Sequence, residues 1–376
     1  MDVGPSALEG YRLKIRTIDI FFVILLFSLS SCRSSYLRYD KTEQLNKNDE
    51  FESQVKIGPV HAAPGANVDA GAKPTESASK PQVPEQKVVT TTAEKKSSKE
   101  KKKKSKGKKA EDKKLEEKSQ APTAREPDIE DTEGFGTGRR PNVDPFRVGE
   151  EVVHDVHYFK VSAGELALKV EPFVEVNGRK SYSFATEIKS GRMFSTFYSV
   201  DDRVVTLMDF DLLIPRVFTL HVKESAQLKQ ARSYFDFDKL EATYWEKRVT
   251  EKDGEEEKKL QWDILNYSQN VFSTIFYMRV FKWEIGKEYS FRVAHDKENL
   301  TFKGKALRKE KLKTEIGEFS TIVIKPEMMV KGIFKPVGDI FIWLSDDDRK
   351  YVLRIESSIR IGTLVSEVIR INPGQP

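Results

Sequence analysis

Strand-like runs at regular intervals are the feature that most restricts how this chain can fold. Between residues 146 and 371, Val, Ile, Phe, Tyr and Trp recur at about every second position, and the runs begin about ten residues apart with turn residues between them. Strand-like and helical segments do not alternate, which disfavours a parallel sheet. The pattern predicts a mainly β fold, as an antiparallel barrel, half-barrel or sandwich.

The predicted strands share a period-two alternation of apolar and polar side chains, which places neighbouring residues on opposite faces of a sheet. Two of them flank Asn177 and Gly178, a pair that tolerates the positive φ angles of a type I′ turn and so predicts a hairpin over 164–190. The others cover residues 151–160, 203–209, 217–222, 230–237, 241–248, 289–295, 300–309, 319–326, 339–344, 351–356 and 363–371.

The segment between residues 266 and 286 has a helical period instead. Asn266 or Ser268 is suited to cap the start of a helix, and Gly286 marks the return to strand. Because apolar stripes usually pack into a core, we expect one helix that covers or plugs the sheet. Its stripe consists of Phe272, Ile275, Phe276 and Val280.

Composition divides the chain into three parts. Residues 33 to about 140 are rich in Lys, Glu, Ser, Pro, Thr and Ala and poor in aromatic side chains, so they cannot bury enough apolar surface to fold. The predicted parts are a signal peptide over 1–31, a disordered Lys-rich tether over 32–141 and a β-rich folded domain over 142–376. Residues 141–376 contain 37 basic and 37 acidic side chains, so the basic excess of the chain belongs to the tether.

A short apolar run precedes the only cysteine of the chain, Cys32. Basic residues at positions 12, 14 and 16 come first, and the apolar run over 20–29 suits a signal peptide but is too short to span a bilayer. Residues 29–32, LSSC, resemble the lipobox of bacterial lipoproteins, which implies cleavage before Cys32 and acylation with fatty acids such as palmitate. The resemblance predicts an envelope protein anchored through Cys32 in the outer membrane, facing the periplasm. The alternative is a plain secretory signal.

Ten of the residues from Lys95 to Lys109 are lysines. In an exported protein, this lysine run predicts adhesion to an anionic envelope surface, either anionic lipid or peptidoglycan. The alternative is a solvated spacer. Export argues against nucleic acid as a partner.

Short motifs of the folded part lie at 146–150 (FRVGE), 163–164 (AG), 197–201 (FYSVD), 263–266 (DILN), 276–279 (FYMR), 317–319 (GEF) and 343–347 (WLSDD). Their order resembles the bacterial domain-of-unknown-function family 3108, which is found in exported proteins. The resemblance covers about 142–371 and implies an envelope-located, mainly β domain without implying an activity. Asn266 departs from the pattern, since serine is expected there.

Three aspartates at 346–348 are the most obvious candidates for a metal or catalytic site. They lie between two strand-like runs, however, where aspartates usually stabilise a turn. His154 and His157 are three residues apart on a predicted strand, so their side chains point to opposite faces of the sheet. We therefore predict no catalytic residue, no metal site and no cofactor.

Arg279 lies beside the apolar stripe of the predicted helix and needs an acidic partner if it is buried. Asp263 and Asp201 are the candidate partners. A structural ion pair is favoured over an anion-binding site at Arg279 and Asp263.

Together, these features predict a non-enzymatic, lipid-anchored envelope protein whose β-rich domain binds a partner or a ligand. One version places an apolar ligand in a cavity beneath the helix. The alternatives are a hydrolase of envelope glycan or lipid, and a structural tether between membrane and cell wall.

Overall fold

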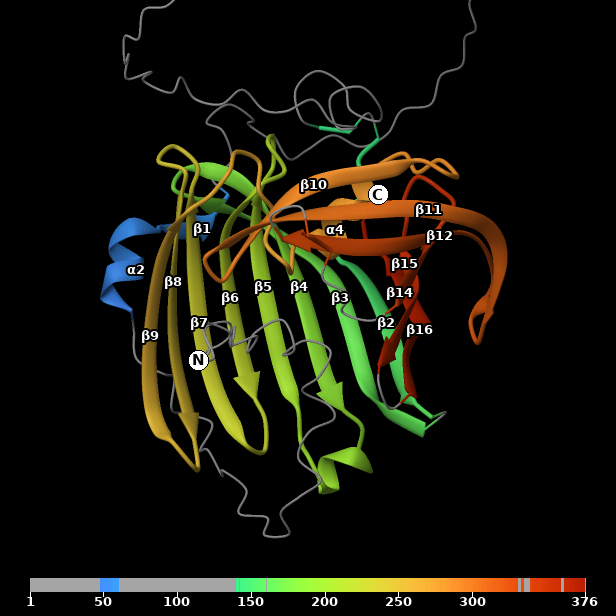
Figure 1. Cartoon of the computed structure of the whole chain (residues 1–376), viewed down its shortest axis with the longest axis horizontal. Helices are drawn as coiled ribbons and strands as arrows, with labels where there is room; N and C mark the ends of the chain where they lie inside the picture. Colours follow the sequence, from blue (N-terminus) through green and yellow to red (C-terminus); the bar gives the residue numbers. More distant parts are fainter. Residues whose placement is uncertain are drawn as a thin grey trace, which may run out of the picture. The chain divides into compact units, whose positions relative to one another are not determined.

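The computed structural model describes residues 48–60, 140–141, 143–159, 161–330, 333–334, 339–359 and 362–375. These residues are built around one antiparallel sheet, shown in Figure 1. Its strands follow the order β10-β11-β12-β14-β15-β16-β2-β3-β4-β5-β6-β7-β8-β9, while the short strands β1 and β13 pair with β3 and β12. Because β10 and β9 end this order, the sheet does not close, and the predicted mainly β antiparallel fold is confirmed.

The strands differ mainly in length. Their bounds are β1 (Ile57–Pro59), β2 (Glu150–Tyr158), β3 (Val161–Val176), β4 (Arg179–Ser190), β5 (Asp201–Asp209), β6 (Pro215–Lys223), β7 (Gln227–Asp236), β8 (Glu241–Thr250), β9 (Gly254–Asp263), β10 (Glu288–His295), β11 (Glu298–Thr314), β12 (Gly317–Val330), β13 (Ile333–Phe334), β14 (Ile340–Ser345), β15 (Val352–Ile359) and β16 (Gly362–Pro373).

Within the residues that the structure describes, four short helical segments accompany the sheet. They are the α-helices α2 (Asp49–Gln54) and α4 (Thr274–Tyr277), and the 3₁₀ turns η1 (Phe194–Thr196) and η2 (Met278–Val280).

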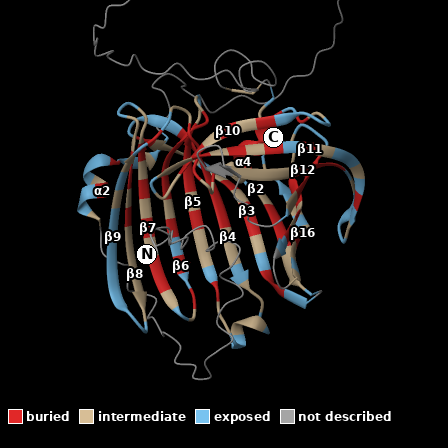
Figure 2. Ribbon diagram, viewed as in Figure 1, coloured by how far each residue is buried: buried red, intermediate tan, exposed pale blue. Residues whose placement is uncertain are grey.

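Most strands pair with a neighbour in sequence, but the pairing of β16 with β2 is long-range. It places Val368 opposite His154 and fixes both ends of the domain in the same part of the sheet. In Figure 1, β3 to β9 run side by side and β10 to β12 run crosswise to them. The main core lies between these two parts of the sheet, as the buried segments in Figure 2 show. Its aromatic members are Phe146, Tyr182, Phe184, Phe276, Tyr277, Phe281, Trp283, Tyr289, Phe291 and Phe302.

The predicted hairpin over 164–190 is confirmed as β3 and β4. Its two turn residues, Asn177 and Gly178, have φ angles of 50° and 77°, as a type I′ turn requires. Near the other end of β3, Gly164 lies so close to β4 that a Cβ there would come within 2.1 Å of the Lys189 carbonyl oxygen. A side chain at this position would therefore force the two strands apart.

Residues 48–60 correct the predicted domain boundaries, since they fall inside the predicted tether but fold onto the domain. Phe51 of helix α2 and Val55, just after the helix, are buried, and the Phe51 ring meets the Trp245 ring edge-on at a centroid distance of 5.8 Å. Strand β1 pairs with the far end of β3, with Ile57 opposite Val176. Phe51 and Val55, four positions apart, are the two residues of this segment that join the hydrophobic core. Two apolar residues hardly change the average composition of a long polar stretch, so composition did not predict that this segment folds.

Asn177 holds the same segment through its side chain. Its Oδ1 accepts a hydrogen bond from the Lys56 backbone N–H at 2.8 Å, and its Nδ2 donates to the Gln54 carbonyl at 3.1 Å. The turn residue that shapes the β3–β4 hairpin therefore also fastens residues 48–60 to it.

Two further predictions differ from the structure. Strand β9 was not among the predicted strands, because its residues are mostly charged and exposed and show no alternation, as befits an edge strand. The covering helix is only the four-residue α4 followed by η2. Neither Asn266 nor Ser268 caps it: the N-cap is Ser273, and the turn that leads into it is held by Asn270, whose Oδ1 accepts hydrogen bonds from the Phe272 and Ser273 N–H groups.

Candidate functional site

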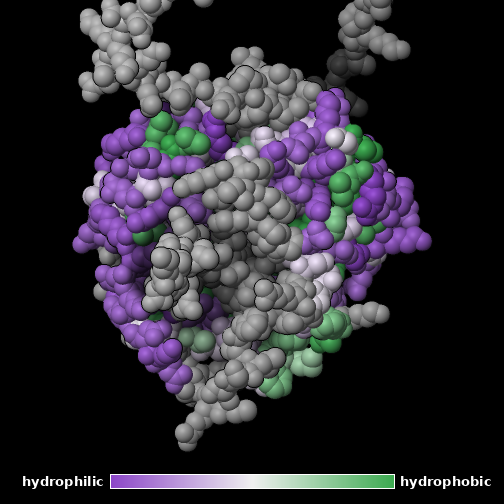
Figure 3. Space-filling view, in the orientation of Figure 1, coloured by the Kyte–Doolittle hydropathy of each residue, from purple (hydrophilic) through white to green (hydrophobic). Residues whose placement is uncertain are grey.

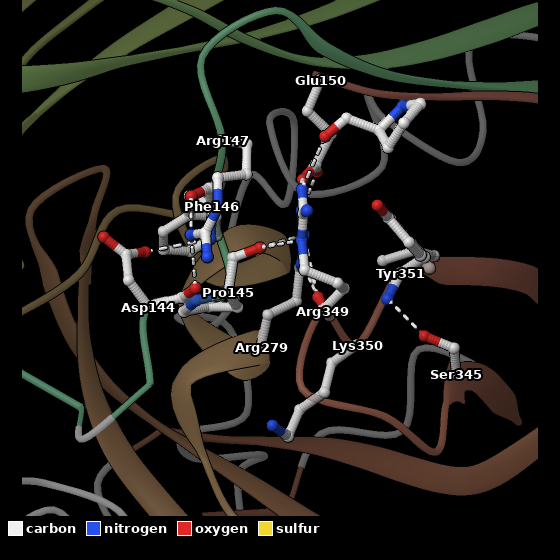
Figure 4. A network of polar contacts seen from close by, with 12 residues as sticks. Asp144, Pro145, Phe146, Arg147, Glu150, Arg279, Ser345, Arg349, Lys350 and Tyr351 are labelled. Atoms are coloured by element: carbon white, nitrogen blue, oxygen red, sulfur yellow. Dashed lines mark hydrogen bonds and ion pairs between the residues drawn. The ribbon is translucent and has the colours of Figure 1, made fainter. Parts of the chain in front are cut away.

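Arg279 lies in a buried polar network with Glu150 and Arg349, shown in Figure 4. Arg279 Nη1 donates to Glu150 Oε1 at 2.6 Å, and Arg349 Nη2 donates to Glu150 Oε2 at 2.6 Å. Only 2% of the surface of Glu150 and of Arg279 is exposed. One carboxylate thus receives charge-assisted hydrogen bonds from two guanidinium groups in a site that water hardly reaches.

Backbone carbonyls take the other donors of Arg279. Its Nε and Nη2 donate to the Arg349 carbonyl at 3.1 and 2.9 Å, and Nη2 also donates to the Pro145 carbonyl at 3.1 Å. The rings of Phe146 and Tyr351 flank the guanidinium at 5.0 and 5.6 Å. The contacts within the chain use each of its nitrogens, so this arrangement suits a structural joint better than an anion-binding site.

The acidic partner of Arg279 differs from the two that the sequence suggested. Asp263 is exposed at the end of β9, where its carbonyl accepts a hydrogen bond from Asn299 Nδ2 at 2.9 Å. Asp201 begins β5 and lies 3.7 Å from Lys189. The prediction considered acidic residues of other motifs, whereas the long-range β16–β2 pairing fixes the position of Glu150, 129 positions away in sequence.

Three of the sequence motifs meet at this network. The FRVGE motif supplies Phe146 and Glu150, the FYMR motif supplies Arg279, and the WLSDD motif leads directly into Arg349. These motifs, which are far apart in sequence, therefore meet in one set of contacts. The contacts join the entry of the domain, the α4–η2 segment and the β14–β15 turn.

The aspartates of the β14–β15 turn have the predicted turn role. Asp347 Oδ1 accepts hydrogen bonds from the Ser345 hydroxyl at 2.8 Å and from the backbone N–H groups of Arg349 and Lys350 at 3.0 and 2.9 Å. Asp346 pairs with Lys309 at 2.7 Å. Within the residues that the structure describes, no three His, Cys, Asp or Glu side chains form a group that could hold a metal ion.

His154 and His157 have separate partners. His154 is fully buried, its Nε2 lies 2.8 Å from the Val352 carbonyl, and its Nδ1 lies 3.1 Å from the Ser366 hydroxyl. Because a carbonyl only accepts, Nε2 carries the proton and Nδ1 accepts from Ser366. Burial lowers the pKa of His154 to about 4, so the ring is neutral at physiological pH. His157 pairs with Asp155 at 2.9 Å.

Packed side chains fill the space beneath α4. The ring of Phe276 stacks on Phe184 at a centroid distance of 4.4 Å, and Tyr277 meets Phe281 and Phe291 edge-on at 5.3 and 5.0 Å. These rings belong to the main core, so the α4 segment packs directly on aromatic side chains of the sheet.

A pair of carboxyl groups, Asp202 and Glu224, lies at one end of the sheet and was not predicted. Glu224 is buried, and its Oε2 accepts hydrogen bonds from Tyr198 Oη at 2.7 Å and Gln227 Nε2 at 2.8 Å. Burial, followed by the charge of Glu224, raises the pKa of Asp202 to about 7. Asp202 is therefore partly protonated near neutral pH, and the bond from Tyr198 to Glu224 holds Tyr198 and its loop against the end of the sheet.

An exposed hydrophobic cluster, which we call the apolar tip, occupies the same end. Phe197, Phe159 and Met193 are 81%, 66% and 60% exposed. The apolar tip lines an open hollow of about 320 Å³ and consists of Tyr158, Phe159, Val161, Met193, Phe194 and Phe197. In the hydropathy view of Figure 3, hydrophobic residues gather at the lower end of the molecule, where β3 and β4 meet their loops.

The sequence contained a signal for the apolar tip that the strand pattern obscured. Residues 192–198, RMFSTFY, place several apolar side chains in a short segment between two predicted strands. A segment too short to form a full helix or strand can bury few of them, so they are candidates for exposure.

Predictions for the N-terminal part lie outside the described residues. These are the signal peptide, the acylated Cys32 and the lysines from Lys95 to Lys109. No helix in the described part of the chain is long and apolar enough to cross a bilayer.

The fold and the buried network define a class of protein, namely a domain built on one open antiparallel sheet and locked by a carboxylate between two arginines. The chain belongs to the family described as "Protein of unknown function (DUF3108)", whose model matches residues 153–369. No curated protein matches the sequence.

Two solved structures resemble the chain at low similarity. One is a β-barrel-like protein of the domain-of-unknown-function family 1849 from Brucella abortus, with 9% identity, a TM-score of 0.36 and coverage of 60% of this chain and 97% of that one. The other is a putative exported protein with a YmcC-like fold from Bacteroides fragilis, with 9% identity, a TM-score of 0.28 and coverage of 61% and 98%.

Proposed function

We propose that this protein is a lipid-anchored component of the bacterial cell envelope whose β-rich domain acts by binding rather than by catalysis. The apolar tip is the observation that carries the binding role. The domain buries a large aromatic core and yet leaves Phe197, Phe159 and Met193 in solvent at one end. Contiguous exposed apolar side chains of this kind usually mark an interaction surface. The LSSC motif at 29–32 supports the lipid anchor.

The carboxyl pair is the feature that a hydrolase would need, and its contacts favour a structural role. Glu224 Oε2 is occupied by Tyr198 and Gln227, and Asp202 Oδ1 accepts from the Lys223 backbone N–H at 2.9 Å. A general acid and base must reach a substrate, whereas these oxygens hold the chain itself. Binding is therefore the better-supported function.

The anchor is tested by metabolic labelling with a clickable fatty acid. Wild-type protein is expected to carry the label, and the Cys32→Ala variant is expected to lose it. Ser35→Ala, just outside the LSSC motif, is the matched control and should be labelled like wild type. Label that persists in Cys32→Ala would refute the anchor.

The binding role needs a separate measurement. Replacement of Phe159 and Phe197 by serine should abolish retention of the protein's partner while leaving the thermal unfolding temperature nearly unchanged, because both side chains are exposed. Retention that survives this double substitution would show that the apolar tip is not the binding surface.

A further inference from the structure

The docked segment 48–60 shortens the connection between the proposed anchor and the domain. Only fifteen residues, 33–47, separate Cys32 from Asn48, which caps α2. A chain of that length spans at most about 50 Å, and about 20 Å on average if flexible. A connection running from Cys32 to residue 142 would contain 109 residues, 33–141, and would average about 55–60 Å.

Several contacts hold residues 48–60 on the domain. Phe51 and Val55 are buried, Trp245 Nε1 donates to Glu50 Oε2 at 3.0 Å, and Lys259 pairs with Glu50 at 2.5 Å. The Lys259 and Trp245 hydrogen bonds also lower the pKa of Glu50, which keeps it charged. Helix α2 is therefore the point from which the short connection leaves the domain.

That point lies toward the end of the sheet that carries the apolar tip. In an antiparallel meander, the β2–β3, β4–β5, β6–β7 and β8–β9 turns all lie at one end. Glu50, two residues after Asn48, contacts Trp245 and Lys259, each five residues from the end of its strand on that side. The first turn of α2 is therefore about 16 Å along the strands from the end that carries the apolar tip.

We propose that the apolar tip inserts into the surface of the same lipid bilayer that holds the anchor, so that the domain lies on the membrane. This inference rests on the proposed lipid anchor. Phenylalanine and methionine side chains on adjacent loop tips suit the boundary between headgroups and acyl chains. Arg192, exposed next to Met193, is placed to meet lipid phosphates.

The geometry favours a bilayer over other apolar occupants. A membrane is the one apolar phase that a fifteen-residue connection keeps permanently within reach of this end. The chain's own residues 61–139 are poor in aromatic and clustered aliphatic side chains, so they offer little to fill the hollow. A second copy of the protein is the remaining occupant, and the experiment distinguishes it.

The chain has one cysteine, which allows a site-specific test. In the processed protein the Cys32 thiol is acylated, so Met193→Cys adds a single thiol that can carry a polarity-sensitive NBD fluorophore. Lys239→Cys, exposed in the β7–β8 turn at the opposite end of the sheet, is the matched control. Both labelled proteins are reconstituted through their anchors into vesicles of phosphatidylethanolamine and phosphatidylglycerol.

NBD at position 193 should shift to shorter wavelength and be quenched by nitroxide-labelled lipid, whereas NBD at position 239 should remain in water. Phe197→Ser should lower the ratio of inserted to free apolar tip by about tenfold. Flotation of the unlabelled protein with the vesicles reports the anchor independently. Protein that does not float refutes the proposed anchor, whereas protein that floats without quenching at position 193 overturns the insertion alone. A blue shift without lipid quenching would indicate a second copy and would also overturn it.

Discussion

Replacement of Arg279 by methionine tests whether the buried network is the joint of this domain. The substitution removes the donor of Glu150 Oε1 and both donors of the Arg349 carbonyl. Arg349 still reaches Glu150 Oε2, but the side chain of Glu150 is only 1% exposed and cannot replace the lost partner with water. Breaking a buried ion pair from one side costs about 3–5 kcal/mol. For a domain of this size, that lowers the unfolding temperature by about 10 °C.

Urea unfolding followed by tryptophan fluorescence measures this change, and a matched pair gives the control. Lys303 and Glu288 lie 2.7 Å apart, nearly the same distance, but their side chains are 34% and 49% exposed, so Lys303→Met should cost less than about 1 kcal/mol. Replacement of both Arg279 and Glu150 by methionine should restore part of the stability, because no buried charge is then left unpaired in that pair. If Arg279→Met costs no more than Lys303→Met, the network is not the joint and the reasoning fails.

Three other predictions follow from the described contacts. Asn177→Gly keeps the positive φ of the turn but removes two hydrogen bonds to residues 48–60, so amide exchange in 48–60 should speed up while the core strands stay protected; unchanged exchange would contradict the docking role. The folded-state pKa of Asp202 is raised to about 7, so between about pH 4 and pH 7 this carboxyl binds more protons in the folded state than in the unfolded state; the stability of wild type relative to Asp202→Asn should therefore fall between pH 5 and pH 8, as measured by thermal unfolding of both proteins, and a constant difference would contradict the raised pKa. His154 has the opposite dependence, because its folded-state pKa is lowered to about 4; stability should fall by up to about 3 kcal/mol as pH drops from 6.5 to 4, and urea unfolding of His154→Gln should lack this loss.

The alternation of apolar and polar side chains predicted the sheet, because most strands have one buried face and one less buried face. Strand β7, for example, has alternating burial from Gln230 to Asp236, and its run was predicted nearly to its true ends. The same rule could not find β9, whose exposed, charged residues carry no alternation, although they still pair with β8 through the backbone. An edge strand of this kind is specified by its backbone pairing with the neighbouring strand. Its charged side chains prevent pairing with a further strand, and they follow no pattern of their own.

The sites depended on contacts that no local pattern encodes. The need of Arg279 for a partner follows from its apolar surroundings, but the choice of Glu150 follows from the register of β16 and β2. The apolar tip likewise forms only because the β2–β3 hairpin and the β4–β5 loop end side by side. Neither loop would form the cluster alone, since Phe159 comes from one and Phe197 from the other.

The two places where residues 61–139 join the domain constrain what the lysine run can do. Pro59, at the end of β1, pairs with Val174 near the end of β3 that is remote from the apolar tip. Arg140 donates to the Phe210 carbonyl at 2.6 Å, and the Phe210 ring packs on Phe173, next to Val174 in sequence. The segment therefore leaves and rejoins the domain at this same end, and it does not lie between the proposed anchor and the domain. Under the proposed anchor at Cys32, the lysine run therefore does not set the distance between the domain and the membrane. Under the proposed insertion of the apolar tip, the attachment points of the run face away from the bilayer. This favours an anionic partner on the far side, such as peptidoglycan, over the lipid that holds the anchor.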